Sequence, residues 1–439
     1  MTQTNCTTAQ ARTLYAKLVD SHTVSRIDEN TVLLYCDIHF ANEYTSPQAF
    51  SGVRERGLPV LVPDAHLCVV DHIIPTHDEW PRRIYDEASR VQALNMKKNC
   101  EDFGIEAFYG PESPYQGVEH VVMEEQGLVR PGMVVICGDS HTTTHGAFGA
   151  MGTGCGATDM ATILMTGELW FRVPEIIEVR LDGEAQKGVY PKDVILEVLG
   201  RIRADGAVYK AIDFTGSYVE QLNVAGRMTI CNMAVEMGAK TAYMQPNADV
   251  LNYVDKRAVR PYEVQFTDPD FQYEESYVFD VSKIEPNLAC PSSVENVHPL
   301  SEVVANGPIK LNQGYIGSCT GGRVEDIAIA AKILKGRHIP EYTRLIVVPA
   351  SNEVMQECMK AGYIQDLMNA GATITTPGCG ACLGAHEGIL APGEVCITST
   401  NRNFPGRMGS TEALMYLASP ATVAASMVNG CITDPRDFL

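Results

Sequence analysis

Short apolar runs that alternate with helical patterns constrain the fold of this chain more than any other feature. Runs typical of buried strands lie at 58–63, 68–74, 133–137, 176–181, 345–349, 373–376 and 396–400. Apolar residues at helical spacing lie between them, for example over 193–202 and 327–334. This alternation predicts an α/β fold with parallel sheets. In such a fold, residues that directly follow strands are the first candidates for a functional site.

The chain of 439 residues is long enough to form several domains. Its segment 245–290 is rich in Asp, Glu, Tyr and Pro and differs from the rest of the sequence. We therefore expect one boundary near residue 290 and a less distinct one near residue 175. The predicted α/β domains are 1–175, with paired Asp and His motifs, 176–290, and 291–439, with closely spaced cysteines and an arginine-containing loop.

Charge and cysteine usage limit the partners and the compartment. The net charge of −20 disfavours a general role in binding nucleic acid or a membrane surface, because like charges repel. The polar N-terminus lacks the apolar segment of a secretory signal, so we expect fourteen reduced cysteines in a cytoplasmic protein. Residues 413–433 form a long uncharged run, but Ser419-Pro420 within it is typical of a helix start. This run predicts two helices of a soluble protein rather than a membrane span.

Three cysteines lie in loops rich in small residues. Cys379 and Cys382 belong to the string PGCGACLG, and Cys319 belongs to GSCTGG, 60 residues before Cys379. By itself the C-x₂-C pair is compatible with a redox pair, half a zinc site or buried thiols. Three thiolates together would leave one position of a metal, or one corner of an iron–sulfur cluster, free for catalysis.

Two Asp/His motifs follow predicted strands. Asp71-His72 lies in VDHIIPTH, and Asp139 and His141 lie in GDSHTTTHG. A carboxylate beside an imidazole raises its basicity, which suits proton transfer. A hydrogen-bonded structural histidine is the alternative for each motif, and His120, which precedes an apolar helix, looks structural when it is considered alone.

An arginine-containing loop and a glutamine complete the candidate residues. Arg402 and Arg407 lie in NRNFPGR after a predicted strand, where two guanidinium groups can bind a di- or tricarboxylate. A solvated surface loop is the alternative. Gln48, in TSPQAF, is uninformative by itself.

The motifs, taken together and in this order, resemble the aconitase superfamily, and within it the 3-isopropylmalate dehydratase and homoaconitase type of large subunit. The strings that carry the resemblance are TSPQAF (45–50), VDHIIPTH (70–77), GDSHTTTHGAFGAMGTG (138–154), GRMTICNM (226–233), GSCTGGRVED (317–326), PGCGACLGAHEGILAPGEVC (377–396) and NRNFPGRMGS (401–410). The resemblance implies three α/β domains around an iron–sulfur cluster and a fourth, swivelling domain. Since this chain ends about thirty residues after Arg407, we expect that fourth domain on a separate small subunit.

The resemblance also implies a role for each motif. It implies a [4Fe–4S] cluster on Cys319, Cys379 and Cys382, with one iron free to act as a Lewis acid on a small hydroxy-dicarboxylate substrate. The other implied site residues fall into three groups: Asp71 and His72 as the acid that protonates the departing hydroxyl, His120, Asp139 and His141 around the iron-bound water, and Gln48, Arg402 and Arg407 on the substrate carboxylates. The base would be a serine of the small subunit.

Asp213 is the one departure from the family pattern. It lies 18 residues before Cys231, where the resemblance implies a glutamate that hydrogen-bonds the iron-bound water. Aspartate is shorter by about 1–1.5 Å, the length of one carbon–carbon step. We expect Asp213 to keep the role through an inward shift of the backbone. The alternatives are a water or a bulkier substrate that fills the gap, or a carboxylate with a structural role only.

The implied activity is that of a hydro-lyase, which removes water from a hydroxy-dicarboxylate and adds it back at the neighbouring carbon. The leading prediction is the 3-isopropylmalate type of leucine biosynthesis; homoaconitase and the dimethylmaleate or citraconate hydratases share all these motifs. A cluster-regulated RNA-binding protein is the alternative outside the enzymes, which the charge of −20 and the retained motifs disfavour. A zinc protein that uses the same cysteines is a third possibility.

Overall fold

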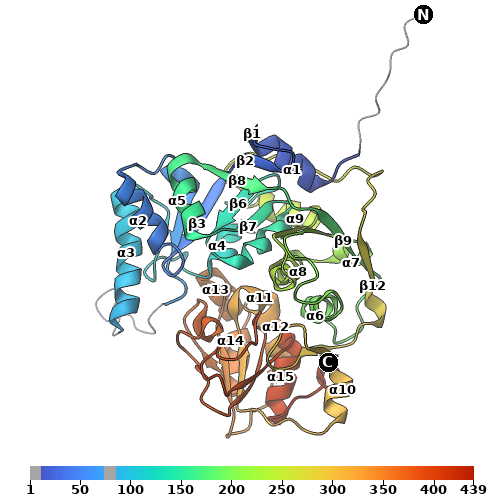
Figure 1. The fold of residues 1–439 in the computed structure, drawn as a ribbon. Coiled ribbons are helices and arrows are strands. Elements are labelled where there is room, and N and C mark those ends of the chain that lie inside the picture. Colours follow the sequence, from blue (N-terminus) through green and yellow to red (C-terminus); the bar gives the residue numbers. More distant parts are fainter. Residues whose placement is uncertain (1–10, 74–85) are drawn as a thin grey trace, which may run out of the picture.

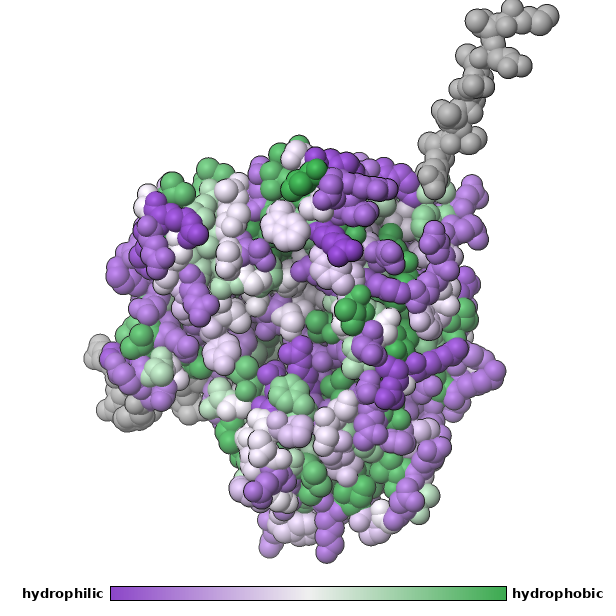
Figure 2. Space-filling view, viewed as in Figure 1, coloured by the Kyte–Doolittle hydropathy of each residue, from purple (hydrophilic) through white to green (hydrophobic). Residues whose placement is uncertain are grey.

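The structure, a computed structural model, describes residues 11–73 and 86–439. Its strands form four sheets, and each sheet draws its strands from one part of the chain. In Figure 1 the N-terminal and middle parts, blue to yellow-green, lie above the C-terminal third, orange to red. Hydrophilic residues cover much of the face in Figure 2, with hydrophobic ones scattered among them. Among the described residues, every helix is too short or too polar to cross a bilayer.

The N-terminal part contains a five-stranded parallel sheet of order β5-β4-β3-β6-β7. Its strands are β3 (Ile38–Asn42), β4 (His66–Val69), β5 (Phe108–Tyr109), β6 (Val134–Cys137) and β7 (Met151–Gly154). The helices of this part are α1 (Leu14–His22), α2 (Pro47–Arg56), α3 (Glu87–Phe103), α4 (Glu119–Glu125), α5 (Ala157–Thr166) and the 3₁₀ helices η1 (Pro63–Ala65) and η2 (Ser140–Phe148). The strand order reverses between β3 and β6, and such a reversal opens a crevice at the carboxyl ends of the strands.

A smaller antiparallel sheet, β1-β2-β8, lies beside the first one; its strands are β1 (Thr23–Arg26), β2 (Thr31–Tyr35) and β8 (Glu168–Arg172). The next sheet, β11-β10-β9-β12, is parallel and consists of β9 (Ile176–Asp182), β10 (Ala211–Thr215), β11 (Thr241–Tyr243) and β12 (Ser276–Asp280). Its helices are α6 (Pro191–Ile202), α7 (Ser217–Gln221), α8 (Val224–Met233), η3 (Ala234–Met237), α9 (Ala248–Asp255) and η4 (Val281–Lys283). One hydrophobic core joins this sheet to the first, with Phe40 and Val135 on one side and Val179 and Phe214 on the other.

The C-terminal part contains a seven-stranded mixed sheet of order β14-β13-β19-β18-β15-β16-β17. Its strands are β13 (Asn287–Ala289), β14 (Val297–Pro299), β15 (Gln313–Ile316), β16 (Arg344–Val347), β17 (Thr373–Ile374), β18 (Val395–Thr398) and β19 (Leu414–Leu417). Its helices are α10 (Leu300–Ala305), α11 (Ser318–Gly321), α12 (Val324–Leu334), α13 (Asn352–Lys360), α14 (Tyr363–Asn369), η5 (Gly380–Leu383), α15 (Pro420–Asn429) and η6 (Pro435–Phe438). A second reversal of strand order lies between β15 and β18.

The parallel α/β fold is as predicted, but three local expectations are not met. Residues 58–62 form a loop with Leu58 49% and Leu61 57% exposed, and Pro63 begins η1. The two prolines of the run lack the N–H groups that a strand needs. The strand expected at 68–74 ends at Val69, so Asp71 follows the strand rather than interrupting it. Within 413–433, β19 replaces the first of the two expected helices. The second helix begins as predicted, with Ser419 accepting the Thr422 N–H.

The first predicted domain boundary falls between two parts of the chain that share a core, and the second falls inside the C-terminal sheet. Residue 175 lies between β8 and β9, but the shared core crosses this point. Residue 290 follows β13, which already pairs with strands of the C-terminal sheet, so the sheets divide between Asp280 and Asn287. The division into three domains therefore stays a prediction.

Candidate active site

A cavity of about 290 Å³ lies where loops from the two reversals of strand order meet. Loops that follow β3, β4 and β6 form one side, and loops that follow β15, β17 and β18 form the other. The predicted site residues that line this cavity are Asp71, His72, His120, Asp139, His141, Cys319, Cys379, Cys382, Arg402 and Arg407. The structure thus brings together residues from both ends of the chain. Gln48 and Asp213 are not among the lining residues.

Asp71 and His72 form a buried pair at the end of β4. His72 Nδ1 lies 2.5 Å from Asp71 Oδ1, and Asp71 Oδ2 accepts the backbone N–H of Glu119. Burial lowers the pKa of His72, but the carboxylates of Asp71, Glu43 and Glu119 outweigh burial and raise it well above its usual value. His72 therefore holds a proton, and its Nε2 atom, 3.9 Å from Asp139 Oδ2, faces the second motif.

Glu43 fixes the loop that carries this pair. Its carboxylate accepts the backbone N–H groups of Asp71, His72 and Ile73 at 3.2, 2.8 and 2.7 Å. Sequence reasoning missed this residue, because nothing in the motif TSPQAF indicates that the preceding glutamate turns toward a distant loop. Three N–H groups on one carboxylate leave the loop little freedom, which keeps His72 in a fixed position for chemistry.

Asp139 lies between two imidazoles at the start of η2. It caps this helix by accepting the His141 N–H at 2.7 Å. Its Oδ1 atom is 3.2 Å from His120 Nε2 and 3.2 Å from His141 Nδ1. Burial raises the pKa of Asp139, but the two imidazoles outweigh it and hold the pKa well below the usual value. His120 therefore contacts the acidic motif that faces the cavity and is not an isolated structural histidine.

Glu236 hydrogen-bonds two residues that line the cavity, His141 and Arg402. Its Oε1 atom lies 2.9 Å from His141 Nε2 and 2.8 Å from Arg402 Nε, and Arg402 also donates to Ser140 Oγ. Although burial raises the pKa of Glu236, His141 and Arg402 lower it more, so this glutamate is ionised. The motif GRMTICNM could have indicated Glu236, because it continues directly into Ala234-Val235-Glu236.

Asp213 lies away from the cavity, which corrects the expectation that it bonds a water there. It is fully buried on β10, between Glu178 of β9 and Tyr243 of β11 in the strand register, and it accepts a 2.5 Å hydrogen bond from Tyr273 Oη. Gln48 is exposed near the start of α2, whereas Tyr44 and Thr45 of the same segment line the cavity. The side chain faces solvent because helical spacing turns it away from the buried Ala49 and Phe50.

We expect Asp213→Asn to change kcat less than twofold, because the side chain does not reach the cavity. Its effect should instead appear in stability. Burial raises the pKa of Asp213 to about 7. In the wild type this group therefore lowers stability as the pH rises from its unfolded pKa, about 3.9, toward 7. The Tm of the variant relative to wild type should rise between about pH 4 and pH 7 in thermal melts, and a large loss of kcat would return Asp213 to the site.

The three cysteines do not all lie close enough together to bind one zinc ion. Cys319 Sγ accepts from the side-chain amides of Asn232 at 3.1 Å and Asn401 at 3.5 Å, which favours a thiolate. Among the described residues, at least two of these three sulfur atoms lie more than 4.8 Å apart. A tetrahedral zinc would place its sulfurs about 3.8 Å apart, given a Zn–S bond of about 2.3 Å. The three thiols are therefore spaced too widely for one zinc ion, and this spacing is compatible with a larger group such as an iron–sulfur cluster.

Comparisons with known proteins agree with the site. A model of the aconitase family (aconitate hydratase) matches residues 16–430. The chain is 46% identical to 3-isopropylmalate dehydratase large subunit 1 of Methanopyrus kandleri, over 93% of this chain and 94% of that one. It is 44% identical to a probable methanogen homoaconitase large subunit of Methanothermobacter thermautotrophicus, over 91% of each chain. A solved structure of aconitase X from Thermococcus kodakaraensis shares the fold, with a TM-score of 0.50 and 10% identity over 91% of each chain. The chain therefore belongs to the aconitase family, as its motifs predict, and is a hydro-lyase with an α/β fold.

Proposed function

We propose that this protein is the large, catalytic subunit of a [4Fe–4S] hydro-lyase that isomerises a hydroxy-dicarboxylate, with 3-isopropylmalate as the first candidate substrate. The observation that carries the proposal is the convergence of three cysteines, two carboxylate–imidazole motifs and two arginines on one cavity. Relatives named 3-isopropylmalate dehydratase and homoaconitase are 46% and 44% identical, so homoaconitate chemistry is the second candidate.

Cys319, Cys379 and Cys382 would hold the cluster. When bound, it supplies a Lewis-acidic iron that polarises the hydroxyl and one carboxylate of the substrate. Burial outweighs the hydrogen bond from Asn232 and raises the pKa of Cys319 to about 12, which favours the neutral thiol when no metal is bound. Because only thiolates bind metal, assembly of the cluster must release protons. A higher pH should therefore favour assembly of the cluster.

The substrate's carboxylates are assigned to the two arginines. Glu236 and Ser140 orient the guanidinium of Arg402, which leaves its remaining N–H groups for a ligand. Arg407 Nε has no hydrogen-bond partner among the residues that the structure describes. Two arginines that line one cavity can bind a dicarboxylate through forked hydrogen bonds.

His72 is assigned as the proton donor. Asp71 fixes Nδ1, so the proton on Nε2 is the one available to the departing hydroxyl. A raised pKa keeps this imidazole protonated at neutral pH. Hydroxide is a poor leaving group, and protonation as the bond breaks makes it leave as water.

The removal of the substrate's C–H proton is assigned to a serine on a small subunit with a swivelling domain. The name "large subunit" of the relatives supports such a partner. In this proposal the complex is cytoplasmic and binds neither nucleic acid nor membrane, consistent with the net charge of −20.

The test is reconstitution of the chain with and without its small subunit under anaerobic conditions. The chain alone should bind about four iron and four sulfide, yet show little turnover. Addition of the small subunit, about 150–200 residues for one domain, should restore isomerisation. Substrates to compare are 2- and 3-isopropylmalate, homocitrate, dimethylmalate and citramalate. Full turnover by the chain alone would place the base within these 439 residues and contradict the assignment.

A further inference from the structure

A line of buried acid and imidazole side chains leads from the active-site cavity into the protein. Asp139 Oδ1 lies 3.2 Å from His120 Nε2. His120 Nδ1 lies 3.4 Å from His145 Nε2, and His145 Nδ1 lies 2.6 Å from Glu124 Oε1. The side chains of His120, His145 and Glu124 are each at most 3% exposed. The mechanism proposed above uses neither His145 nor Glu124.

Helical spacing on two elements produces this line. His120 and Glu124 are four residues apart on α4, and so point to the same face. His145 lies in η2, which begins at the cap Asp139 and packs against α4. The four groups therefore alternate between two packed elements, and each one is within reach of the next.

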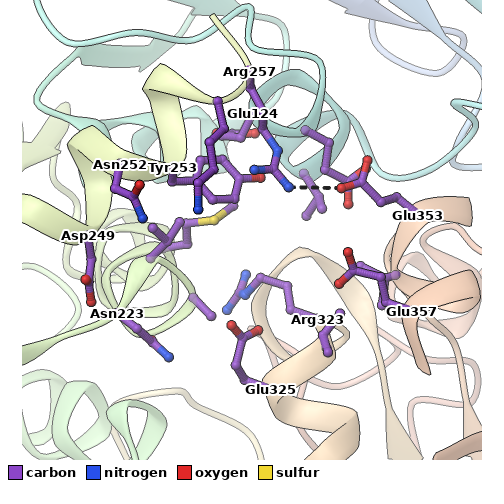
Figure 3. A pocket seen from close by; sticks show the side chains of 18 residues that line it. Glu124, Asn223, Asp249, Asn252, Tyr253, Arg257, Arg323, Glu325, Glu353 and Glu357 are labelled. Carbon is purple, nitrogen blue, oxygen red and sulfur yellow. Dashed lines mark hydrogen bonds and ion pairs between the residues drawn. The ribbon is translucent and has the colours of Figure 1, made fainter. Parts of the chain in front are cut away.

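The line ends at a second cavity, of about 320 Å³, between α4, α8, α9, α12 and α13. Figure 3 shows Glu124 at this cavity together with Arg323 and the ion pair of Arg257 with Glu353, whose atoms are 3.1 Å apart. The cavity reaches the surface, since the exposed Lys256 and Glu357 belong to its wall. Glu124 Oε2 has no hydrogen-bond partner among the described residues. A cavity of this size that is lined by charged side chains has room for waters that can supply that partner.

We propose that Glu124 and His145, through His120, form a proton relay between this rear cavity and Asp139. The inference rests on the proposed function, because it serves proton transfer at the hydro-lyase site. The relay needs one proton in each of its three contacts. At rest Glu124 O–H points to His145 Nδ1, and His145 Nε2–H points to His120 Nδ1. His120 Nε2 lies 3.2 Å from Asp139 Oδ1 without a hydrogen bond between them, so the imidazole must turn toward Asp139 for the last transfer.

One transfer moves each proton by one place. When an oxygen beside Asp139 takes up a proton, the O–H bond of Glu124 breaks and a new N–H bond forms at His145 Nδ1. The Nε2 proton of His145 passes to His120 Nδ1, and the Nε2 proton of His120 passes to Asp139 and onward. Glu124 is left as a carboxylate, and water in the rear cavity supplies a proton to its free Oε2 atom. When the active site gives up a proton in the return half of the isomerisation, each proton moves back by one place and Oε2 releases its proton to the cavity, which restores the resting arrangement.

The charge states of the groups match this resting arrangement. Burial raises the pKa of Glu124 well above its usual value and lowers the pKa of His145 to about 3, so the acid is protonated and the imidazole neutral. Asp139 is ionised, as described above. A path from behind is useful where a partner subunit closes the front of the site, because closure excludes the water that would otherwise carry protons.

The test compares Glu124→Gln, His145→Gln and the matched control Glu125→Gln in the reconstituted complex. Glu125 also lines the rear cavity, but it accepts a hydrogen bond from Ser351 and does not contact His145. Without substrate, the infrared difference between wild type and Glu124→Gln should contain the C=O stretch of a protonated carboxyl group. His145→Gln should shift this band and Glu125→Gln should leave it in place.

With substrate, Glu124→Gln and His145→Gln should lower kcat by about 10²-fold, the scale of one proton-transfer group, with KM changed less than twofold. Glu124→Asp should restore part of kcat, and the solvent isotope effect on kcat should differ from that of wild type. A Glu124→Gln complex with wild-type kcat, or a carboxyl band that His145→Gln does not shift, would overturn the relay. If no hydroxy-dicarboxylate reacts at all, the proposed function fails, whereas the infrared comparison still decides whether the relay exists.

Discussion

Replacement of Cys379 by serine is expected to remove the cluster and to lower activity by about 10³-fold or more. The Lewis acid contributes several kcal/mol to leaving-group departure, and each 1.36 kcal/mol corresponds to about tenfold in rate. A serine hydroxyl is a poor ligand for soft metals, so only Cys319 and Cys382 would remain to hold the cluster. Iron and sulfide content, visible absorbance and turnover of the reconstituted complex measure the effect.

Cys396→Ser is the matched control for this substitution. Cys396 is fully buried on β18 of the C-terminal sheet, but it does not line the active-site cavity. We expect it to lower Tm while it leaves iron content unchanged. Retention of a full cluster and of activity in Cys379→Ser would show that Cys379 is not a ligand. Loss of the cluster in both variants would show that the sheet, rather than the thiol, controls assembly.

The parts of the site that could be predicted from the sequence are those that directly follow strands. Asp71, Asp139 and Cys319 each come within a few residues of the carboxyl end of a parallel strand. Parallel strands place these ends at one edge, so neighbouring motifs must meet there. The same reasoning predicted the α/β fold, since the alternation of strands and helices is a local property of the chain.

The rest depended on packing that a linear pattern does not record. Asp213 lies at a plausible spacing, but spacing does not say which face of β10 its side chain occupies, and four of that strand's five residues are buried. Glu236 reaches the site because α8 packs against η2 and carries the following 3₁₀ helix with it. We predicted a helix for the apolar run before Ser419 because a short apolar segment has no clear period. The run is instead β19, a strand that pairs with β13 on one side and β18 on the other.

Glu236→Gln is expected to lower kcat by about 10–100-fold, the range for residues that orient a site's ligands. The carboxylate positions His141 and Arg402 through one oxygen, at 2.9 and 2.8 Å. Glutamine can keep an oxygen acceptor for both partners but loses the charge, so its hydrogen bonds to His141 and Arg402 are weaker and hold them less firmly. KM should rise as well, because Arg402 is assigned to a substrate carboxylate, while the iron content should stay at the wild-type level.

Asp213→Asn provides the matched control, since it also neutralises a buried carboxyl of the middle sheet region but leaves the cavity intact. The two substitutions should also differ in their effect on stability. The lowered pKa of Glu236 stabilises the fold above its unfolded pKa of about 4.3, and this contribution is lost as the pH falls through the lower folded pKa. Glu236→Gln should therefore lower Tm at pH 7 and lower it less at pH 3–4, opposite in direction to Asp213→Asn at neutral pH. A kcat within twofold of wild type for Glu236→Gln would show that the position of Arg402 and His141 is set by other contacts.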